Sequence, residues 1–130
     1  MSNDLHAIEK TIQTYFDGLY EGDTDKIASA FHEVSHLYTV GNDGTVIDVP
    51  RAQWLDGVRS RPSPKSKNLA RHDRILSINM AGPEAAPDMA TVIVNCQMPP
   101  RYFTDQLSLL KTGGKWRIVS KTFRTDMREK

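Results

Sequence analysis

The sequence predicts an α+β fold in which helices cover one face of an antiparallel sheet. Near the N-terminus apolar residues recur every three or four positions, as in a helix, and through most of the second half they alternate with polar residues, as in strands. The segments with strand alternation follow one another without helical patterns between them, which favours an antiparallel meander. A chain of 130 residues has the usual size of one domain, so we expect a single domain over residues 1–130.

Two helices are expected before any strand. The first extends over about four to five turns, and its apolar stripe comprises Leu5, Ile8, Ile12, Tyr15, Phe16 and Leu19. Gly22 breaks this helix, and either Asp23 or Thr24 can cap a short second helix that ends near Phe31.

A hairpin and a third helix complete the first half of the chain. The turn sequence from Gly41 to Gly44 favours a hairpin, and Pro50 suits the start of a helix. The expected elements are strands at Ser35 to Val40 and Thr45 to Val49, a helix from Arg51 to about Arg59, and a polar, irregular loop from Ser60 to Ala70.

The second half is expected to form four long strands. They are Arg71 to Met80, Met89 to Met98, a strand after Pro99-Pro100 that contains Asp105, and Lys115 to about Phe123. The tail from Arg124 to Lys130 is expected to fray. Alternation places Leu76, Ile78 and Met80 on the inner face of the first of these strands, and extending it back adds His72 and Arg74.

Asp105 is the most informative residue, because it lies in the apolar row formed by Phe103, Leu107 and Leu109. A carboxylate in a buried row is costly unless it finds donors or a charge partner. Two explanations stay open: Asp105 is a pocket residue, or it caps backbone donors at a bulge or pairs with a neighbouring arginine.

Composition excludes several classes of function. The net charge of +1 gives no overall attraction to nucleic acid or to an anionic membrane. No stretch has the roughly 20 apolar residues of a membrane span, so we expect a cytoplasmic protein. The one cysteine, Cys96, lies in an apolar row and is expected to be a small buried residue. The sequence indicates no cofactor.

Four segments resemble the nuclear transport factor 2-like superfamily, which includes SnoaL-like and ketosteroid-isomerase-like folds, and within it the bacterial putative lumazine-binding proteins. The segments are Tyr15 to Asp23, Ala30 to His32, Phe103 to Asp105 and Trp116 to Phe123. The resemblance covers nearly the whole chain. It implies a cone-shaped fold with three helices, in which a curved antiparallel or mixed sheet wraps around a long N-terminal helix and leaves a pocket.

The resemblance also suggests roles for single residues. In ketosteroid isomerases a tyrosine and a protonated aspartic acid form an oxyanion hole beside an aspartate base. Asp105 corresponds to the acid, and Tyr15 lies on the helix that contains the tyrosine. The base position falls at about Thr39, which cannot take a proton from carbon near neutral pH, so the steroid-isomerase reaction is not expected. His72 or His36 remains a candidate for a relocated base.

The candidate ligand-binding residues are Tyr15, Tyr38, Trp54, His72, Phe103 and Asp105, and the candidate catalytic residues are Asp105, Tyr15 and His72. Tyr38 depends on the parity of the first strand, where the inner row is either Leu37 with Thr39 or His36 with Tyr38; we prefer the second. His32 and His36 are four residues apart, but the helix is expected to end near Phe31, so we predict no metal site.

The segment from Arg59 to Arg74 contains six basic residues against one acidic residue, Asp73. Its two interpretations are a solvated loop and a lid that selects an anionic ligand. The expected small-molecule partner is apolar or aromatic, and anionic if the lid interpretation holds.

Two functions stay open at this level. The first is a small-molecule-binding protein, or a lyase or isomerase, with an apolar pocket between the first helix and the sheet. In its enzymatic form Asp105 and Tyr15 donate hydrogen bonds to a ligand oxygen and His72 moves the proton. The second is a non-catalytic association module that forms a homodimer through the outer face of the sheet. The outer row of the Asp105 strand comprises Tyr102, Thr104, Gln106, Ser108 and Leu110.

Overall fold

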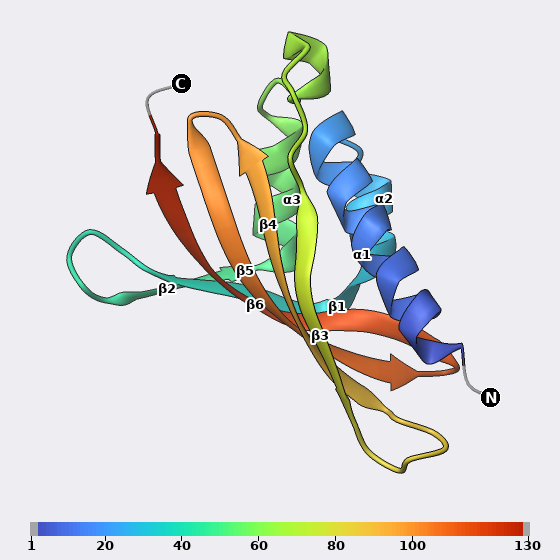
Figure 1. Ribbon diagram of the computed structural model, residues 1–130. Coiled ribbons are helices and arrows are strands. Elements are labelled where there is room, and N and C mark those ends of the chain that lie inside the picture. Colours follow the sequence, from blue (N-terminus) through green and yellow to red (C-terminus); the bar gives the residue numbers. More distant parts are fainter. Residues whose placement is uncertain (1–2, 129–130) are drawn as a thin grey trace.

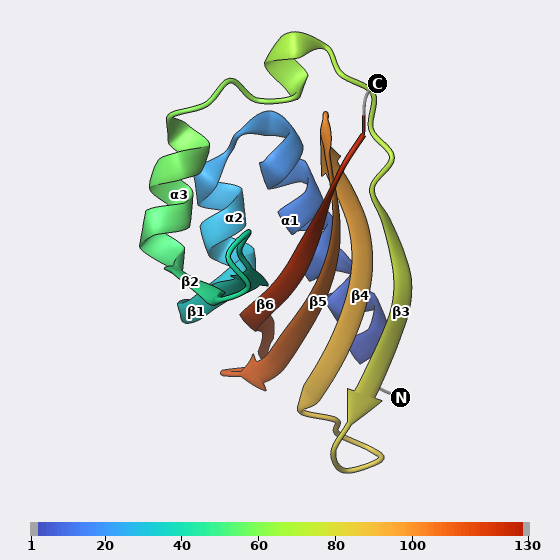
Figure 2. The same ribbon diagram turned by 90° about the vertical axis from the view of Figure 1, so that its left-hand side faces the viewer.

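Within residues 3–128, which the computed structural model describes, three α-helices lie on one face of a curved six-stranded sheet (Figures 1 and 2). The α+β prediction is confirmed. The helices are α1 (Asp4–Glu21), α2 (Thr24–Ala30) and α3 (Arg51–Arg59), with a 3₁₀ turn η1 (Lys65–Lys67). The strands are β1 (Phe31–Val40), β2 (Val46–Pro50), β3 (Arg74–Ala81), β4 (Met89–Met98), β5 (Arg101–Thr112) and β6 (Lys115–Met127). None of these helices is long and apolar enough to cross a membrane.

The sheet is mixed, with the strand order β2-β1-β6-β5-β4-β3. The predicted meander from β3 to β6 and the predicted β1–β2 hairpin are both antiparallel. The two units join through a parallel pairing of β1 with β6, which local sequence patterns do not reveal. This pairing brings residues from the first and last strands to one place.

Helix α1 buries the predicted apolar stripe except Leu5, which is 48% exposed; Ile8, Ile12 and Tyr15 have no exposed surface. It ends at Gly22, whose φ of 70° is the left-handed conformation that glycine adopts without strain. The Asp23 side chain then accepts hydrogen bonds from two backbone amides of α2, as an N-cap does.

Three predicted boundaries were wrong. Strand β1 begins at Phe31, directly after α2, where a strand was expected only from Ser35. Strand β3 begins at Arg74. The expected frayed tail is part of β6, which continues to Met127 because its last residues pair with the beginning of β5; residues 129–130 lie outside the described part.

Two bulges change which side chains face the helices. In β3, Leu76 is the extra residue between the pairs Ile75–Val94 and Ser77–Ile93. In β6, Val119 is the extra residue between the pairs that Ile118 and Ser120 form with β5. Because side chains alternate between the two faces of a strand, each bulge reverses the predicted direction, inward or outward, of every side chain on one side of it.

Candidate functional site

A buried chain of three polar side chains joins α1, β5 and β6. The Lys121 Nζ donates to the Tyr15 hydroxyl at 2.8 Å, and that hydroxyl donates to Oδ2 of Asp105 at 2.5 Å. The Lys121 ammonium also lies 3.7 Å from the same carboxylate oxygen. Asp105 and Tyr15 are fully buried, and Lys121 is 5% exposed. These three side chains therefore hold the buried Lys121 ammonium beside an oppositely charged partner, Asp105.

Sequence reasoning missed Lys121 because of the bulge at Val119. Counting in twos from the buried Ile118 places Ser120 and Thr122 inside and Lys121 outside, whereas the structure buries Lys121 opposite Leu107. One signal was present: Ile118 and Phe123 are both apolar but five positions apart, an odd spacing that one uninterrupted strand face cannot contain.

Four aromatic rings surround the Lys121 ammonium, and we call them the aromatic cluster. The distances from Nζ to the ring centroids are 4.6 Å for Trp54, 5.1 Å for Phe123, 5.2 Å for Tyr15 and 6.0 Å for Phe103. Ring faces at these distances attract a cation. The cluster thus compensates part of the cost of removing the ammonium from water.

The Asp105 carboxylate is satisfied on one side only. Its Oδ2 receives the Tyr15 hydroxyl and lies 3.5 Å from the Cys96 thiol, while Oδ1 is buried with no hydrogen-bond partner among residues 3–128. Burial and the nearby carboxylate raise the pKa of the Tyr15 phenol well above its ordinary value, and the same two causes raise that of the Cys96 thiol. Both groups therefore stay protonated near neutral pH.

An open cleft of about 390 Å³ lies above Lys121, between α3 and strands β1, β5 and β6. Its walls are mainly apolar, and its lining includes Leu37, Trp54, Val58, Phe103, Lys121 and Phe123. Arg61 and Arg101 also line it. The arrangement provides flat apolar walls and cationic hydrogen-bond donors, a combination that suits an aromatic ligand with an acceptor oxygen.

The cleft does not lie where the sequence placed a pocket. Helix α1 buries Ile8, Ile12 and Tyr15 against the sheet, and only Leu19 of α1 lines the cleft. Of the predicted ligand-binding residues, Trp54 and Phe103 line it, whereas Tyr15 and Asp105 lie beneath and contact Lys121. Asp105 lies 3.7 Å from a cation, but this cation is Lys121 and not the arginine that one explanation expected.

Two predicted pocket residues lie elsewhere. Tyr38 was placed inward, but Leu37 is the buried residue of that pair, because Leu37 pairs with the inward Lys121; Tyr38 stacks on His36 instead, with ring centroids 6.0 Å apart. His72 was placed inward by alternation, which the bulge at Leu76 reverses, and it is exposed.

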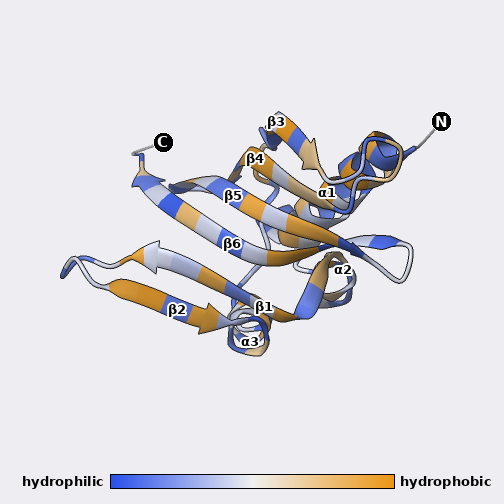
Figure 3. Cartoon of the chain, turned by 90° about the horizontal axis from the view of Figure 1, so that it is seen from below, coloured by the Kyte–Doolittle hydropathy of each residue, from blue (hydrophilic) through white to orange (hydrophobic). Residues whose placement is uncertain are grey.

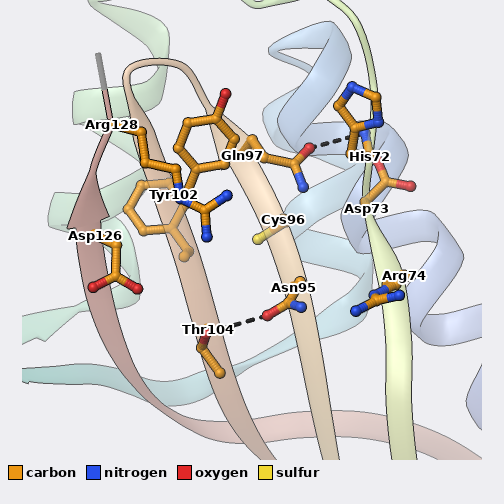
Figure 4. Close-up of a pocket in the computed structure, with 11 residues that line it drawn as sticks. His72, Asp73, Arg74, Asn95, Cys96, Gln97, Tyr102, Thr104, Asp126 and Arg128 are labelled. Atoms are coloured by element: carbon orange, nitrogen blue, oxygen red, sulfur yellow. Dashed lines mark hydrogen bonds between the residues drawn. The ribbon is translucent and has the colours of Figure 1, made fainter. Parts of the chain in front are cut away.

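Figure 4 shows the surroundings of His72, on the face of the sheet opposite the helices. The backbone amide of His72 donates to Gln97 Oε1 at 2.9 Å, and both residues line a polar groove of about 500 Å³. The structure therefore brings Tyr15 and Asp105 together but separates His72 from them by the thickness of the sheet.

The remaining histidine candidates do not converge either. His36 Nδ1 lies 2.6 Å from Asp48 at the surface, and His32 Nδ1 accepts from the Val34 amide. Residues 3–128 contain no group of three or more potential ligands that could hold a metal ion. Thr39 lies where the resemblance to ketosteroid isomerases places the general base, and its hydroxyl donates to the Phe123 carbonyl at 2.6 Å.

Comparison with known families identifies the chain. Residues 3–124 match the family described as Putative lumazine-binding. The chain belongs to this family. The matched residues include all three helices, the buried side chains Tyr15, Asp105 and Lys121, and every residue of the aromatic cluster. No curated protein sequence matches the chain.

Solved structures show the nuclear transport factor 2-like fold. An NTF2-like protein of unknown function from Shewanella baltica has a TM-score of 0.83 at 23% identity, over 97% of this chain and 98% of that one. Another from Silicibacter pomeroyi has a TM-score of 0.80 at 22% identity, over 97% and 100%. A ketosteroid isomerase-like protein from Erwinia carotovora has a TM-score of 0.70 at 13% identity, over 96% and 98%. These likenesses establish the fold alone.

Proposed function

We propose that this protein binds a planar aromatic molecule in the cleft between α3 and the sheet, with Lys121 holding an acidic or carbonyl oxygen of the ligand. The observation that supports this is the position of the Lys121 ammonium, which is nearly buried yet lines an apolar cleft. An ammonium has three N–H donors, and among the described residues Lys121 donates one hydrogen bond, to Tyr15. A ligand acceptor would complete its hydrogen bonding.

The rest of the site supports the same class of ligand. Trp54 and Phe103 offer aromatic surfaces against which a flat ring can stack. The family is named for lumazine binding, and lumazine is a flat bicyclic molecule with carbonyl oxygens. In this proposal Asp105 and Tyr15 position Lys121 and do not touch the ligand, which is a change from the roles that the sequence suggested.

Calorimetric titration tests the proposal with lumazine, 2-naphthoate and the neutral 2-naphthylmethanol as probes. We expect 2-naphthoate to bind at least about tenfold more tightly than the neutral alcohol, since a charge-assisted hydrogen bond is lost in the alcohol. The variant Lys121→Met should abolish this preference. Lys115→Met is the matched control, because Lys115 is an exposed lysine on the same strand.

Thermal melting of each variant shows whether it folds. If Lys121→Met does not fold, Trp54→Leu replaces it as the test, because Trp54 is only half-buried and lines the cleft; the loss of an aromatic wall should then weaken all three probes. Equal binding of acid and alcohol to the wild-type protein would refute the role of Lys121.

We also propose that the protein forms a homodimer through the outer face of the sheet. No helix among residues 3–128 covers this face (Figure 2). It presents Leu110, 44% exposed, and the cross-strand pair Val40 and Val46, each 69% exposed, and apolar residues continue along the edge strand β2 (Figure 3). Light scattering should give twice the monomer mass, and Gln106→Arg at the centre of the face should give the monomer. A monomeric wild-type protein would refute this proposal.

A further inference from the structure

A second, smaller hollow of about 140 Å³ adjoins the cleft at the end where α3 leads into the loop. The two hollows share Arg61, Met98 and Arg101 as lining residues, so they lie next to each other. Figure 2 shows that the loop from α3 to β3 and the turn from β4 to β5 meet at this end of the molecule. We call this space the outer hollow.

The outer hollow is lined by three cations, Arg61, Lys67 and Arg101, on walls that include Pro62 and Pro64. No carboxylate of residues 3–128 lines either this hollow or the cleft. Three cations around one small space repel one another, and an anion bound among them would offset this repulsion. Their shared location indicates a site for negative charge.

Two other arginines of the same segment, Arg59 and Arg71, have acidic partners. Arg59 pairs with Asp56 at 2.9 Å, and Arg71 lies 3.0 Å from both Asp17 and Asp73. By contrast, the structure gives no ion pair to Arg61 or Arg101 within the described residues. The Nε of Arg61 donates to the Gly57 carbonyl at 3.0 Å, which fixes the guanidinium and leaves its terminal nitrogens available.

We infer that the outer hollow is an anion subsite, and that the ligand is an elongated aromatic molecule with an acidic group at each end. This inference rests on the proposed function, in which Lys121 holds the inner oxygen. The outer group is a carboxylate or a phosphate monoester, both of which match the geometry of arginine donors. A ligand with one acidic group would occupy only the inner part of the site.

Three rigid probes test the inference by calorimetric titration at low salt. They are 2-naphthoate with one acidic group, naphthalene-2,6-dicarboxylate with two, and 6-phosphonooxy-2-naphthoate, which has a phosphate in place of the second carboxylate. Each exposed cation that contacts the second group should contribute about a two- to fivefold gain in affinity. The wild-type protein should therefore bind at least one of the doubly acidic probes about tenfold more tightly than 2-naphthoate. The gain should shrink at high salt, because the outer cations are exposed.

The double variant Arg61→Gln/Arg101→Gln should abolish the preference for the doubly acidic probes over 2-naphthoate, so that all three probes bind it with the same affinity. Arg59→Gln is the control, since Arg59 belongs to the same basic segment but pairs with Asp56. A gain with the phosphate probe alone would identify a phosphate site, and an equal gain with both would identify a general anion site; either supports the inference.

The inference and the proposed function can fail separately. If all three probes bind the wild-type protein with equal affinity and Lys121→Met weakens each of them, the anion subsite is refuted and the proposed function stands. If the double variant retains the preference for two acidic groups, the subsite is also refuted. If no probe binds, or if Lys121→Met changes none of the affinities, the proposed function fails and the inference falls with it.

Discussion

The pairing of Lys121 with Asp105 can be measured with a double-mutant cycle made of Lys121→Met, Asp105→Asn and the double variant. Two unit charges 3.7 Å apart attract by about 4 kcal/mol at an effective dielectric constant of about 20. Removing either partner alone leaves a buried group without compensation, at an expected cost of about 3 to 5 kcal/mol in the free energy of unfolding.

The double variant removes both charges, so its cost should be smaller than the sum of the two single costs by about 2 to 4 kcal/mol. Urea unfolding at pH 7 measures each free energy, and with a slope of about 2 kcal/mol per M each single variant should lower the midpoint by about 1.5 to 2.5 M. Arg59→Gln with Asp56→Asn provides a control cycle on an exposed pair, which should show no measurable coupling. A coupling below about 1 kcal/mol for Lys121 and Asp105 would mean that water screens the pair and that the site is not dry.

Three further predictions concern the same core. Tyr15→Phe removes the donor to Asp105 and should lower the free energy of unfolding by about 2 to 3 kcal/mol in a urea titration; a loss below about 0.5 kcal/mol would contradict the short hydrogen bond. Because the folded state raises the pKa of both Tyr15 and Cys96, the unfolded chain releases their protons first as pH rises. Stability should thus fall above about pH 9, by up to about 1.4 kcal/mol per pH unit and group, and Tyr15→Phe/Cys96→Ala should flatten the curve. Gly18→Ala would place a Cβ 2.7 Å from Ile27 Cγ1 and should lower the free energy of unfolding by about 1 to 3 kcal/mol, which thermal melting detects. An unchanged melting temperature would show that α2 shifts to make room for the methyl group.

Local patterns predicted the helices and the meander well, because they depend on residues near one another in the chain. The stripe of α1, the capping position before α2 and the turn at Gly44 all follow from rules that involve a few neighbouring residues. The parallel pairing of β1 with β6 joins segments about 80 residues apart in the sequence, and no single segment shows it. Such a contact depends on the whole fold.

The candidate site was predicted only in part for a related reason. Asp105, Trp54 and Phe103 were identified because each lies on an uninterrupted element, where the period alone fixes the direction of a side chain. Lys121 was missed and His72 was misplaced because a single extra backbone residue precedes the first and follows the second. Bulges have no strong residue preference outside glycine positions, so the sequence reveals them only indirectly, as through the odd spacing of Ile118 and Phe123.

The aromatic cluster has a consequence for the ligands that the protein rejects. Cages of aromatic rings are widely used by proteins to recognise quaternary ammonium groups. Here the cage is already occupied, and its guest is Lys121, which the chain itself supplies. A cationic ligand would meet a filled cage and a like charge, so choline-like or methylammonium compounds should be excluded from this cleft while their anionic counterparts are admitted.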